Sequence, residues 1–175
     1  LFEVTSGDAA GAVVLVDSFD AATDTVTLAS DISDDFVEAD TFIIRPSATL
    51  ASVFGATNDV ANSGAGLTAT GSFAGSDQVW VPNGASGFDK FAYVLGNPFL
   101  GTPNAWKNSA GATVDPADVN LVYTDGVIIN GAAAGNLVVS GSVKLEPVQV
   151  VLNAQFNYLS GIFPAGLTLA ESELS

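Results

Sequence analysis

Apolar and polar residues alternate in short runs along most of this chain. In "QVWVPN" (residues 78–83) and "DKFAYVL" (residues 89–95), an apolar side chain recurs at nearly every second position. A period of two is typical of β-strands that bury one face. The runs are separated by Gly, Asn, Asp and Pro, which favour turns. We therefore expect an all-β fold, an antiparallel β-sandwich or barrel-like domain with long loops rich in Gly, Ala and Ser.

The first 55 residues predict a hairpin, a strand and a short helical turn. The runs "AVVLVDSF" and "DTVTLAS" are rich in β-branched residues and flank "DAAT", which has the composition of a hairpin loop. The stretch "DTFIIRP" predicts a strand that Pro46 ends. In "SATLASVFG" we expect a helical turn that is capped by Ser47 and closed by Gly55.

The rest of the chain predicts further strands between long loops. Residues 56–77 are rich in small and polar residues, with "GLTATGSF" as a strand candidate inside them. Loops surround "AW" at residues 105–106, and "DPADVNL" predicts a short turn capped by Asp115. The last strands are expected in "GVIING", "NLVVSGSVKLEPVQVVLN" and "FNYLSGIF".

The length of 175 residues suits one ordinary domain or two very small ones. We expect a single domain over residues 1–175. The alternative is a division into a hairpin unit at residues 1–55 and a main sandwich at residues 56–175. Hydrophobic residues make up 48% of the chain and charged residues only 13%, so the chain can bury enough apolar surface to fold.

The chain is strongly acidic, with 19 Asp and Glu against four Lys and Arg and a formal net charge of −15. Like-charge repulsion argues against nucleic acids and anionic membrane surfaces as partners. The longest uncharged run, residues 147–170, is interrupted by Asn, Gln, Gly and Pro, which indicates strands and a turn rather than a membrane helix. We expect no membrane insertion. An acidic, Lys-poor surface suits an extracellular protein in a cation-rich medium.

The composition excludes the commonest catalytic centres. Without His and Cys, Ser-His-Asp and Cys-His catalysis and ordinary zinc sites are impossible. The carboxylates of Asp77 and Asp89 lie near aromatic residues and are the candidates for glycoside hydrolysis, but both stand at strand starts, where Asp is a common turn residue. We therefore expect no catalytic residues, no required cofactor, and a protein that is not an enzyme.

Four aromatic residues allow two interpretations. They are Trp80, Trp106, Tyr93 and Phe91. On an exposed sheet face they would form a platform that stacks on sugar rings. Aromatic residues in β-proteins more often lie in the core, and we favour that interpretation.

Aspartates gather in two connections, and calcium is the small ligand that such oxygen-rich loops suit best. Neither connection has the residue spacing of an EF-hand, and a solvated acidic loop is the favoured alternative. The candidate calcium ligands are Asp17, Asp20 and Asp24 in "DSFDAATD", and Asp31, Asp34 and Asp35 in "DISDDFVEAD".

Several motifs come in an order that resembles a protein family. They are "LFEVTSGDAAG", "DTFIIRPSATLASVFG", "SDQVWVPN", a central Trp, "DGVIINGAAAGNLVVSGSV" and "TLAESEL". In this order they resemble an uncharacterised family of secreted, often paralogous proteins found mainly in Verrucomicrobia. The resemblance covers most of the chain and implies a secreted protein and an architecture, not a chemistry.

Two stretches of the chain resemble each other. Residues 40–55 and 156–175 both pass from an apolar strand into a proline and then into Thr-Leu-Ala, which aligns Pro46 with Pro164. The chain thus looks like a repeat cut out of phase, with an unpaired strand edge at each end that recruits strands from neighbours. Pairing of both ends within one sandwich is the alternative. The candidate subunit-interface residues are Leu1, Phe2, Val4, Phe156, Tyr158, Leu159, Ile162, Phe163, Leu167 and Leu169.

These observations together predict a secreted structural protein whose partners are copies of itself. We expect it to assemble into an extracellular filament, sheath or surface layer at the cell surface. The alternative is a polysaccharide-binding or adhesive surface module.

Overall fold

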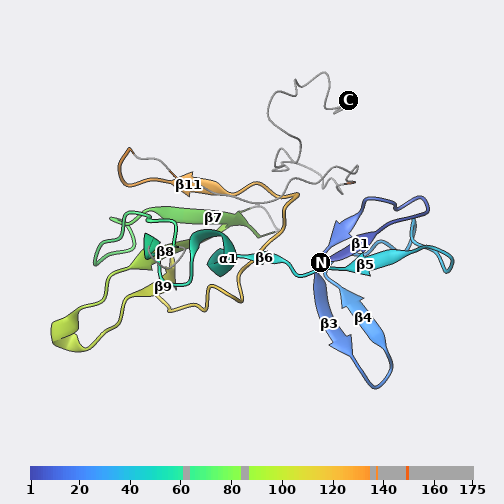
Figure 1. The fold of residues 1–175 in the computed structure, drawn as a ribbon, viewed down its shortest axis with the longest axis horizontal. Helices are drawn as coiled ribbons and strands as arrows, with labels where there is room; N and C mark the ends of the chain where they lie inside the picture. Colours follow the sequence, from blue (N-terminus) through green and yellow to red (C-terminus); the bar gives the residue numbers. More distant parts are fainter. Residues whose placement is uncertain (61–63, 84–86, 135–136, 138–148, 150–175) are drawn as a thin grey trace. The chain divides into compact units, whose positions relative to one another are not determined.

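Antiparallel β-strands form nearly all of the regular structure of this protein. The computed structural model describes residues 1–60, 64–83, 87–134, 137 and 149 (Figure 1). The α-helix α1 (Leu50–Phe54) has only five residues. The described strands form four sheets, none of which closes into a barrel. The prediction of an all-β antiparallel fold is confirmed.

The chain divides into two compact units, residues 1–47 with 142–175 and residues 48–141. The boundary precedes α1, whereas the alternative division expected from the sequence placed it after residue 55. The difference has a packing reason, because Leu50 and Phe54 of α1 are almost completely buried in the core of the second unit.

The first unit contains a three-stranded sheet with the order β2-β1-β5 and a separate hairpin, β3-β4. Its strands are β1 (Phe2–Val4), β2 (Val13–Val14), β3 (Val16–Asp20), β4 (Thr25–Leu28) and β5 (Phe42–Ile44). The predicted hairpin is present as β3 and β4, but the start of its first arm forms the separate strand β2, which pairs with β1 instead. The strand before Pro46 lies where the sequence predicted it. The rings of Phe36 and Phe42 pack against the buried Phe2, with centroids 5.6 and 4.5 Å away.

The N-terminal strand β1 lies in the middle of its sheet. Phe2 is opposite Val14 in β2 and Ile44 in β5, so both edges of β1 are occupied within the chain. The expectation of an unpaired strand at residues 1–5 is therefore wrong. The physical reason is that β2 and β5 both return to β1 and pair with its backbone groups within the chain.

The second unit contains a four-stranded sheet with the order β11-β7-β8-β9 and a short pair, β10-β6. Its strands are β6 (Ala48–Thr49), β7 (Gln78–Pro82), β8 (Phe88–Val94), β9 (Ala105–Asn108), β10 (Asn120–Leu121) and β11 (Ile128–Asn130). Val79 is paired with Phe91, and Tyr93 with Trp106. These four side chains lie on one face of the sheet and are buried against α1. The strands predicted in "QVWVPN", "DKFAYVL" and "GVIING" are confirmed.

Side chains determine the local structure on both sides of α1. Thr49, not Ser47, caps the helix: its Oγ1 accepts from the Ser52 amide at 3.2 Å, and Ser52 Oγ accepts from the Thr49 amide at 2.8 Å. Gly55 closes the helix as expected, with a φ of 90°. The predicted strand at residues 66–73 is absent. The Asn58 side chain bonds both backbone groups of Leu67 at 2.7 Å, and the carbonyls of Thr68 and Thr70 accept single backbone hydrogen bonds, so the segment does not form a strand ladder.

Candidate functional site

The outer edge of β5 carries backbone groups that pair with none of the described residues. The amide of Arg45 donates to Leu1 at 2.9 Å, and the amide of Thr5 donates to Thr41 at 2.8 Å. Backbone groups alternate in direction along an antiparallel strand. The N–H and C=O groups of Phe42 and Ile44 therefore point away from β1. In the described part of the chain, no strand or loop pairs with them.

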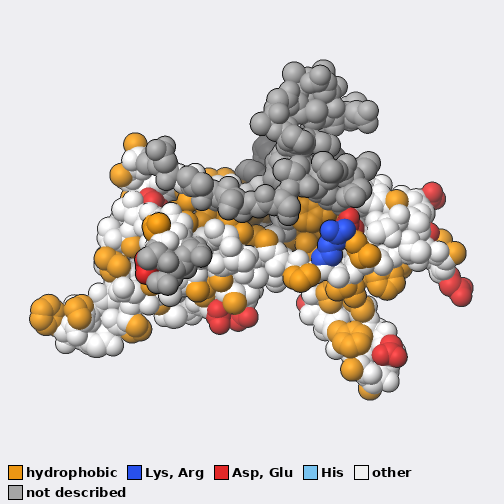
Figure 2. Space-filling view, viewed as in Figure 1, with side chains coloured by type: hydrophobic (Ala, Val, Ile, Leu, Met, Phe, Trp, Pro, Cys, Tyr) orange, Lys and Arg blue, Asp and Glu red, His pale blue; other side chains and the backbone are white. Residues whose placement is uncertain are grey.

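The side chains at this edge are apolar and exposed. Phe42 is 47% exposed and Ile44 is 57% exposed. Hydrophobic side chains are visible at the surface of this unit in Figure 2. An edge that combines unpaired backbone groups with exposed apolar side chains is a template for strand addition. We call Phe42 and Ile44, with their outward backbone groups, the β5 edge.

One charged pair lies next to the β5 edge. Arg45 Nε lies 3.1 Å from Glu3 Oε2, and the Glu3 side chain is nearly buried while that of Arg45 is half exposed. Arg45 is the only Arg of the chain. β5 has only three residues and Pro46 follows Arg45, so the edge available to a partner is short.

The sequence-derived interface residues divide into two groups. Phe2 and Val4 are buried in the core of their own unit, and the N-terminal amine of Leu1 donates to the Arg45 carbonyl at 2.7 Å. The remaining candidates, residues 156–169, lie outside the described residues. Sequence reasoning missed the β5 edge, because a strand ended by a proline gives no signal of which of its edges is paired.

Of the aspartates in the β3-β4 hairpin, Asp20 is engaged in local backbone contacts. Its Oδ1 accepts a hydrogen bond from the Ala22 amide at 2.9 Å. That bond, with a further one from Thr23, holds the pKa of Asp20 below its ordinary value. Asp24 adopts a left-handed backbone with φ 52°, a conformation that Asp tolerates in tight turns. The Asp20 carboxylate thus stabilises the turn, which agrees with the alternative interpretation of a solvated acidic loop.

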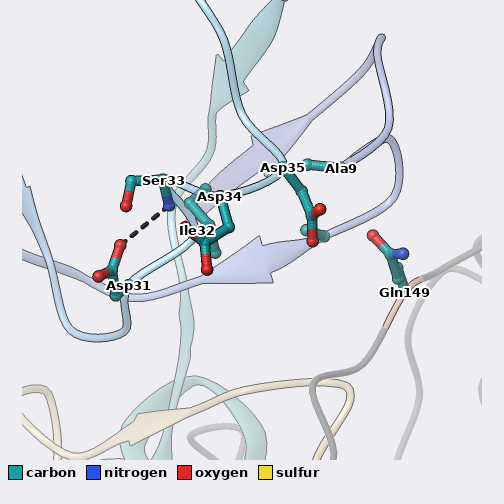
Figure 3. A pocket seen from close by; sticks show the side chains of 8 residues that line it. Ala9, Asp31, Ile32, Ser33, Asp34, Asp35 and Gln149 are labelled. Atoms are coloured by element: carbon teal, nitrogen blue, oxygen red, sulfur yellow. Dashed lines mark hydrogen bonds between the residues drawn. The ribbon is translucent and has the colours of Figure 1, made fainter.

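The second acidic connection lines a shallow pocket of about 360 Å³ in the first unit (Figure 3). Asp31 Oδ1 accepts from the Ser33 amide at 2.9 Å, and the Ser33 hydroxyl and amide lower the pKa of Asp31. Figure 3 shows Asp35 and Gln149 facing the same open space. The lining residues are Ala9, Ala12, Asp31, Ile32, Ser33, Asp34, Asp35 and Gln149.

The described polar side chains of the pocket come from Asp31, Ser33, Asp34, Asp35 and Gln149. Within the described residues, no three acidic side chains lie close enough together to hold one metal ion. Calcium prefers six to eight oxygen ligands, most of them from carboxylates and carbonyls. Calcium binding by the candidate aspartates thus stays a prediction that the described geometry does not favour.

Three of the four aromatic candidates belong to the core. Trp106, Tyr93 and Phe91 are each less than a tenth exposed. Trp80 is partly exposed, but Lys90 Nζ lies 3.9 Å from its ring centroid and covers one face. Its indole nitrogen donates to Gln78 Oε1 at 2.9 Å. The residues proposed as a sugar-stacking platform therefore do not form one.

The two candidate carboxylates have different surroundings. Asp77 accepts amide hydrogen bonds from Thr68 at 2.7 Å and from Ala132 at 2.6 Å, so both of its oxygens hold backbone segments together. Asp89 accepts a long hydrogen bond of 3.5 Å from the Asn83 amide group. Asp77 thus has a structural role just before β7, as the interpretation as a turn residue expects, whereas Asp89 lies within β8 opposite Val81.

A second exposed apolar feature was missed by sequence reasoning. The loop between β8 and β9 carries Phe99, which is 97% exposed, and Leu100, which is 76% exposed. The signal lay in "GNPFLGTPN", in which turn residues flank two large apolar ones on both sides.

Among the described residues, no helix combines the length and the apolar character needed to cross a membrane. Comparisons of the chain with protein-family models, curated proteins and solved structures find no match.

Proposed function

We propose that this protein is a secreted structural subunit that assembles with copies of itself into an extracellular filament, sheath or surface layer. The observation that supports the proposal is the β5 edge, where Phe42 and Ile44 combine outward backbone groups with exposed apolar side chains. An added strand would receive up to four hydrogen bonds from these groups and would cover both side chains.

The strand that we propose for this edge comes from the C-terminal part of another copy. Residues 156–163, "FNYLSGIF", are uncharged and rich in aromatic and apolar residues. Residues 162–170 also resemble the sequence around β5 itself, so they suit the same kind of sheet position. Exchange of this kind is heterologous, because one surface of each copy contacts a different surface of the next. It gives a ring if the rotation closes and a filament if it does not.

Charge sets the conditions for assembly. With a net charge of −15, copies repel one another in dilute buffer. Salt at about 0.15 M reduces the range of this repulsion to roughly 8 Å. The three residues of β5 are uncharged, although Glu38 and Asp40 stand shortly before them. Assembly should therefore increase with ionic strength, as suits an extracellular medium rich in cations.

A polysaccharide-binding role has less support. The aromatic side chains that would carry it are mostly buried, and Lys90 covers one face of the partly exposed Trp80. We therefore propose assembly as the function.

The test is the oligomeric state of the purified protein, measured by sedimentation velocity and negative-stain electron microscopy at low and high salt. We expect polymers of the wild type at high salt. Ile44→Lys places a charge on the edge, and Ile44→Pro removes an N–H that points outward without breaking a bond to β1. Both variants should remain folded and stay monomeric.

Val60→Lys is the matched control, because Val60 is an apolar residue that is 72% exposed in the other unit. This variant should assemble like the wild type. A wild type that stays monomeric at high concentration and high salt would overturn the proposal. Assembly of both Ile44 variants at wild-type level would remove the β5 edge from it.

A further inference from the structure

The loop between β8 and β9, residues 95–104, is a finger with an apolar tip. It is the yellow-green projection at the lower left of Figure 1, and hydrophobic side chains gather at its end in Figure 2. Phe99 and Leu100 lie in the 3₁₀ turn η2 (Pro98–Leu100) and are the two most exposed large apolar residues among those described. Exposed apolar side chains of this size at one tip point to an interaction.

Local hydrogen bonds hold the tip in a single turn. Asn97 caps η2, and its Oδ1 accepts from the Phe99 amide at 2.9 Å. Pro98 follows as the first residue of the turn, where no N–H is needed. Gly101 ends the turn with a left-handed φ of 66°, which favours Gly.

Hydrogen bonds also hold the two arms of the finger together at its base. The amide of Asn97 donates to Thr102 Oγ1 at 2.7 Å, and the amide of Gly96 donates to Asn104 Oδ1 at 2.8 Å. A side chain at Gly96 would collide with the carbonyl of Thr102, so the two arms approach closely. Because the finger is held this way before any partner binds, binding would order little of it and lose little entropy.

The absence of charge on the finger indicates which kind of surface it can bind. Residues 91–106 contain no charged side chain, so the finger is neutral from base to tip. The chain as a whole carries −15 and has only four basic residues. Such a protein is repelled by anionic lipid headgroups, but a neutral finger meets no such barrier at an uncharged surface.

The small apolar area of the tip further restricts the kind of partner. A buried aromatic side chain covers about 150–250 Å², whereas a stable protein–protein interface needs about 800 Å² on each partner. Phe99 and Leu100 alone fall well below that area, and the other exposed apolar residues of the finger are only Leu95, Pro98 and Pro103. A bilayer requires no matching surface, only apolar groups that reach the boundary between headgroups and acyl chains.

We propose that Phe99 and Leu100 insert into the boundary region of an uncharged lipid bilayer and hold the protein at that surface. This contact is shallow and reversible, because two side chains bind far less strongly than a spanning helix. It differs from the sequence-based expectation of no membrane insertion, which rested on the absence of an uninterrupted apolar helix and on repulsion from anionic surfaces. The proposal does not depend on self-assembly, since the finger and the β5 edge belong to different units.

The test is flotation of the purified protein with phosphatidylcholine vesicles, compared with vesicles that also contain phosphatidylglycerol. We expect binding to the uncharged vesicles that is insensitive to salt, and weaker binding to the anionic ones at low salt. The double variant Phe99→Ser/Leu100→Ser should lose binding by about tenfold or more, because both apolar contacts disappear. Val60→Ser removes an exposed apolar residue elsewhere and should bind like the wild type.

A spectroscopic readout reports the location of the tip. In Phe99→Trp, fluorescence beyond that of Trp80 and Trp106 should shift to shorter wavelength when phosphatidylcholine vesicles are added. Wild-type protein that fails to float with uncharged vesicles would overturn the proposal, as would equal binding by the double variant. Loss of self-association by the double variant with unchanged vesicle binding would instead identify the finger as a subunit contact.

Discussion

The indole Nε1 of Trp106 donates a hydrogen bond of 3.0 Å to the carbonyl oxygen of Gly55. Gly55 ends α1, and Trp106 belongs to β9, the last strand in the order β11-β7-β8-β9. The bond therefore connects the helix to this strand across a sequence separation of 51 residues. The Trp106 side chain is only 1% exposed, and its ring packs edge-on against Tyr93. Trp106 thus belongs to the buried hydrophobic core of the second unit, together with Leu50 and Phe54 of α1.

Trp106→Phe should lower the free energy of unfolding by about 2–4 kcal/mol. The substitution leaves the buried Gly55 carbonyl without this donor and opens a cavity beside α1. Urea denaturation followed by circular dichroism measures the loss. Trp80→Phe is the matched control, and it should cost less because Trp80 is partly exposed and bonds a neighbouring side chain. Equal losses in the two variants would contradict the central role of Trp106.

Asp77 and Asp89 should differ in their effect on stability. Asp77→Ala removes the acceptor of two backbone amides, from Thr68 and Ala132, and should cost about 1–3 kcal/mol. Asp89→Ala removes only one long hydrogen bond and should stay within about 0.5 kcal/mol of the wild type. Thermal melts of both variants at one pH measure the difference. If Asp77→Ala leaves the free energy of unfolding unchanged, the two hydrogen bonds to Asp77 contribute nothing to stability.

The sequence predicted strands well where one face is buried in a regular ladder. Period-two alternation located β7 and β8, and the β-branched arms around "DAAT" located β3 and β4. The same reasoning assigned a strand to residues 66–73, which alternate apolar and polar residues but are held by the side chains of Asn58 and Asp77 together with isolated backbone hydrogen bonds. The period of the sequence does not distinguish a segment that pairs as a strand in a sheet from one whose backbone is bonded by side chains.

The candidate sites were harder to predict, because edges and tips depend on pairing across long sequence separations. The N-terminal strand looked unpaired because no hairpin partner precedes it, whereas both of its partners, β2 and the distant β5, follow it in the sequence. The β5 edge and the finger both follow from which neighbours are present, not from local composition. The acidic connections were visible in the sequence, but only the structure shows Asp20 and Asp31 engaged with backbone amides.

Chelation of calcium should leave the melting temperature unchanged. A ligand bound only by the native state stabilises it by mass action, so a real site would be revealed by destabilisation in chelator. The described acidic loops do not bring three ligands together. Differential scanning calorimetry with chelator, and then with excess calcium, measures the effect. A decrease in chelator that calcium reverses, and that Asp34→Asn/Asp35→Asn abolishes, would establish the calcium site instead.

Asp125 should make the protein less stable as the pH rises from acid to neutral. Partial burial raises the pKa of its carboxyl, and a hydrogen bond from the Thr124 hydroxyl only partly opposes this. Since the folded state binds the proton more tightly than the unfolded state, the favourable contribution is complete below the unfolded pKa. It is lost as the pH rises through the higher folded pKa.

The variant Asp125→Asn isolates this effect. It keeps the size and an acceptor oxygen of the side chain but carries no charge, so it should melt at a higher temperature than the wild type at neutral pH. The difference should shrink as the pH falls below both pKa values, because the wild-type carboxyl is then neutral as well. Asp118→Asn is the control, since Asp118 is an exposed acid of the same unit and its replacement changes the net charge equally. If both variants shift the melting temperature equally at every pH, the effect comes from net charge and not from the burial of Asp125.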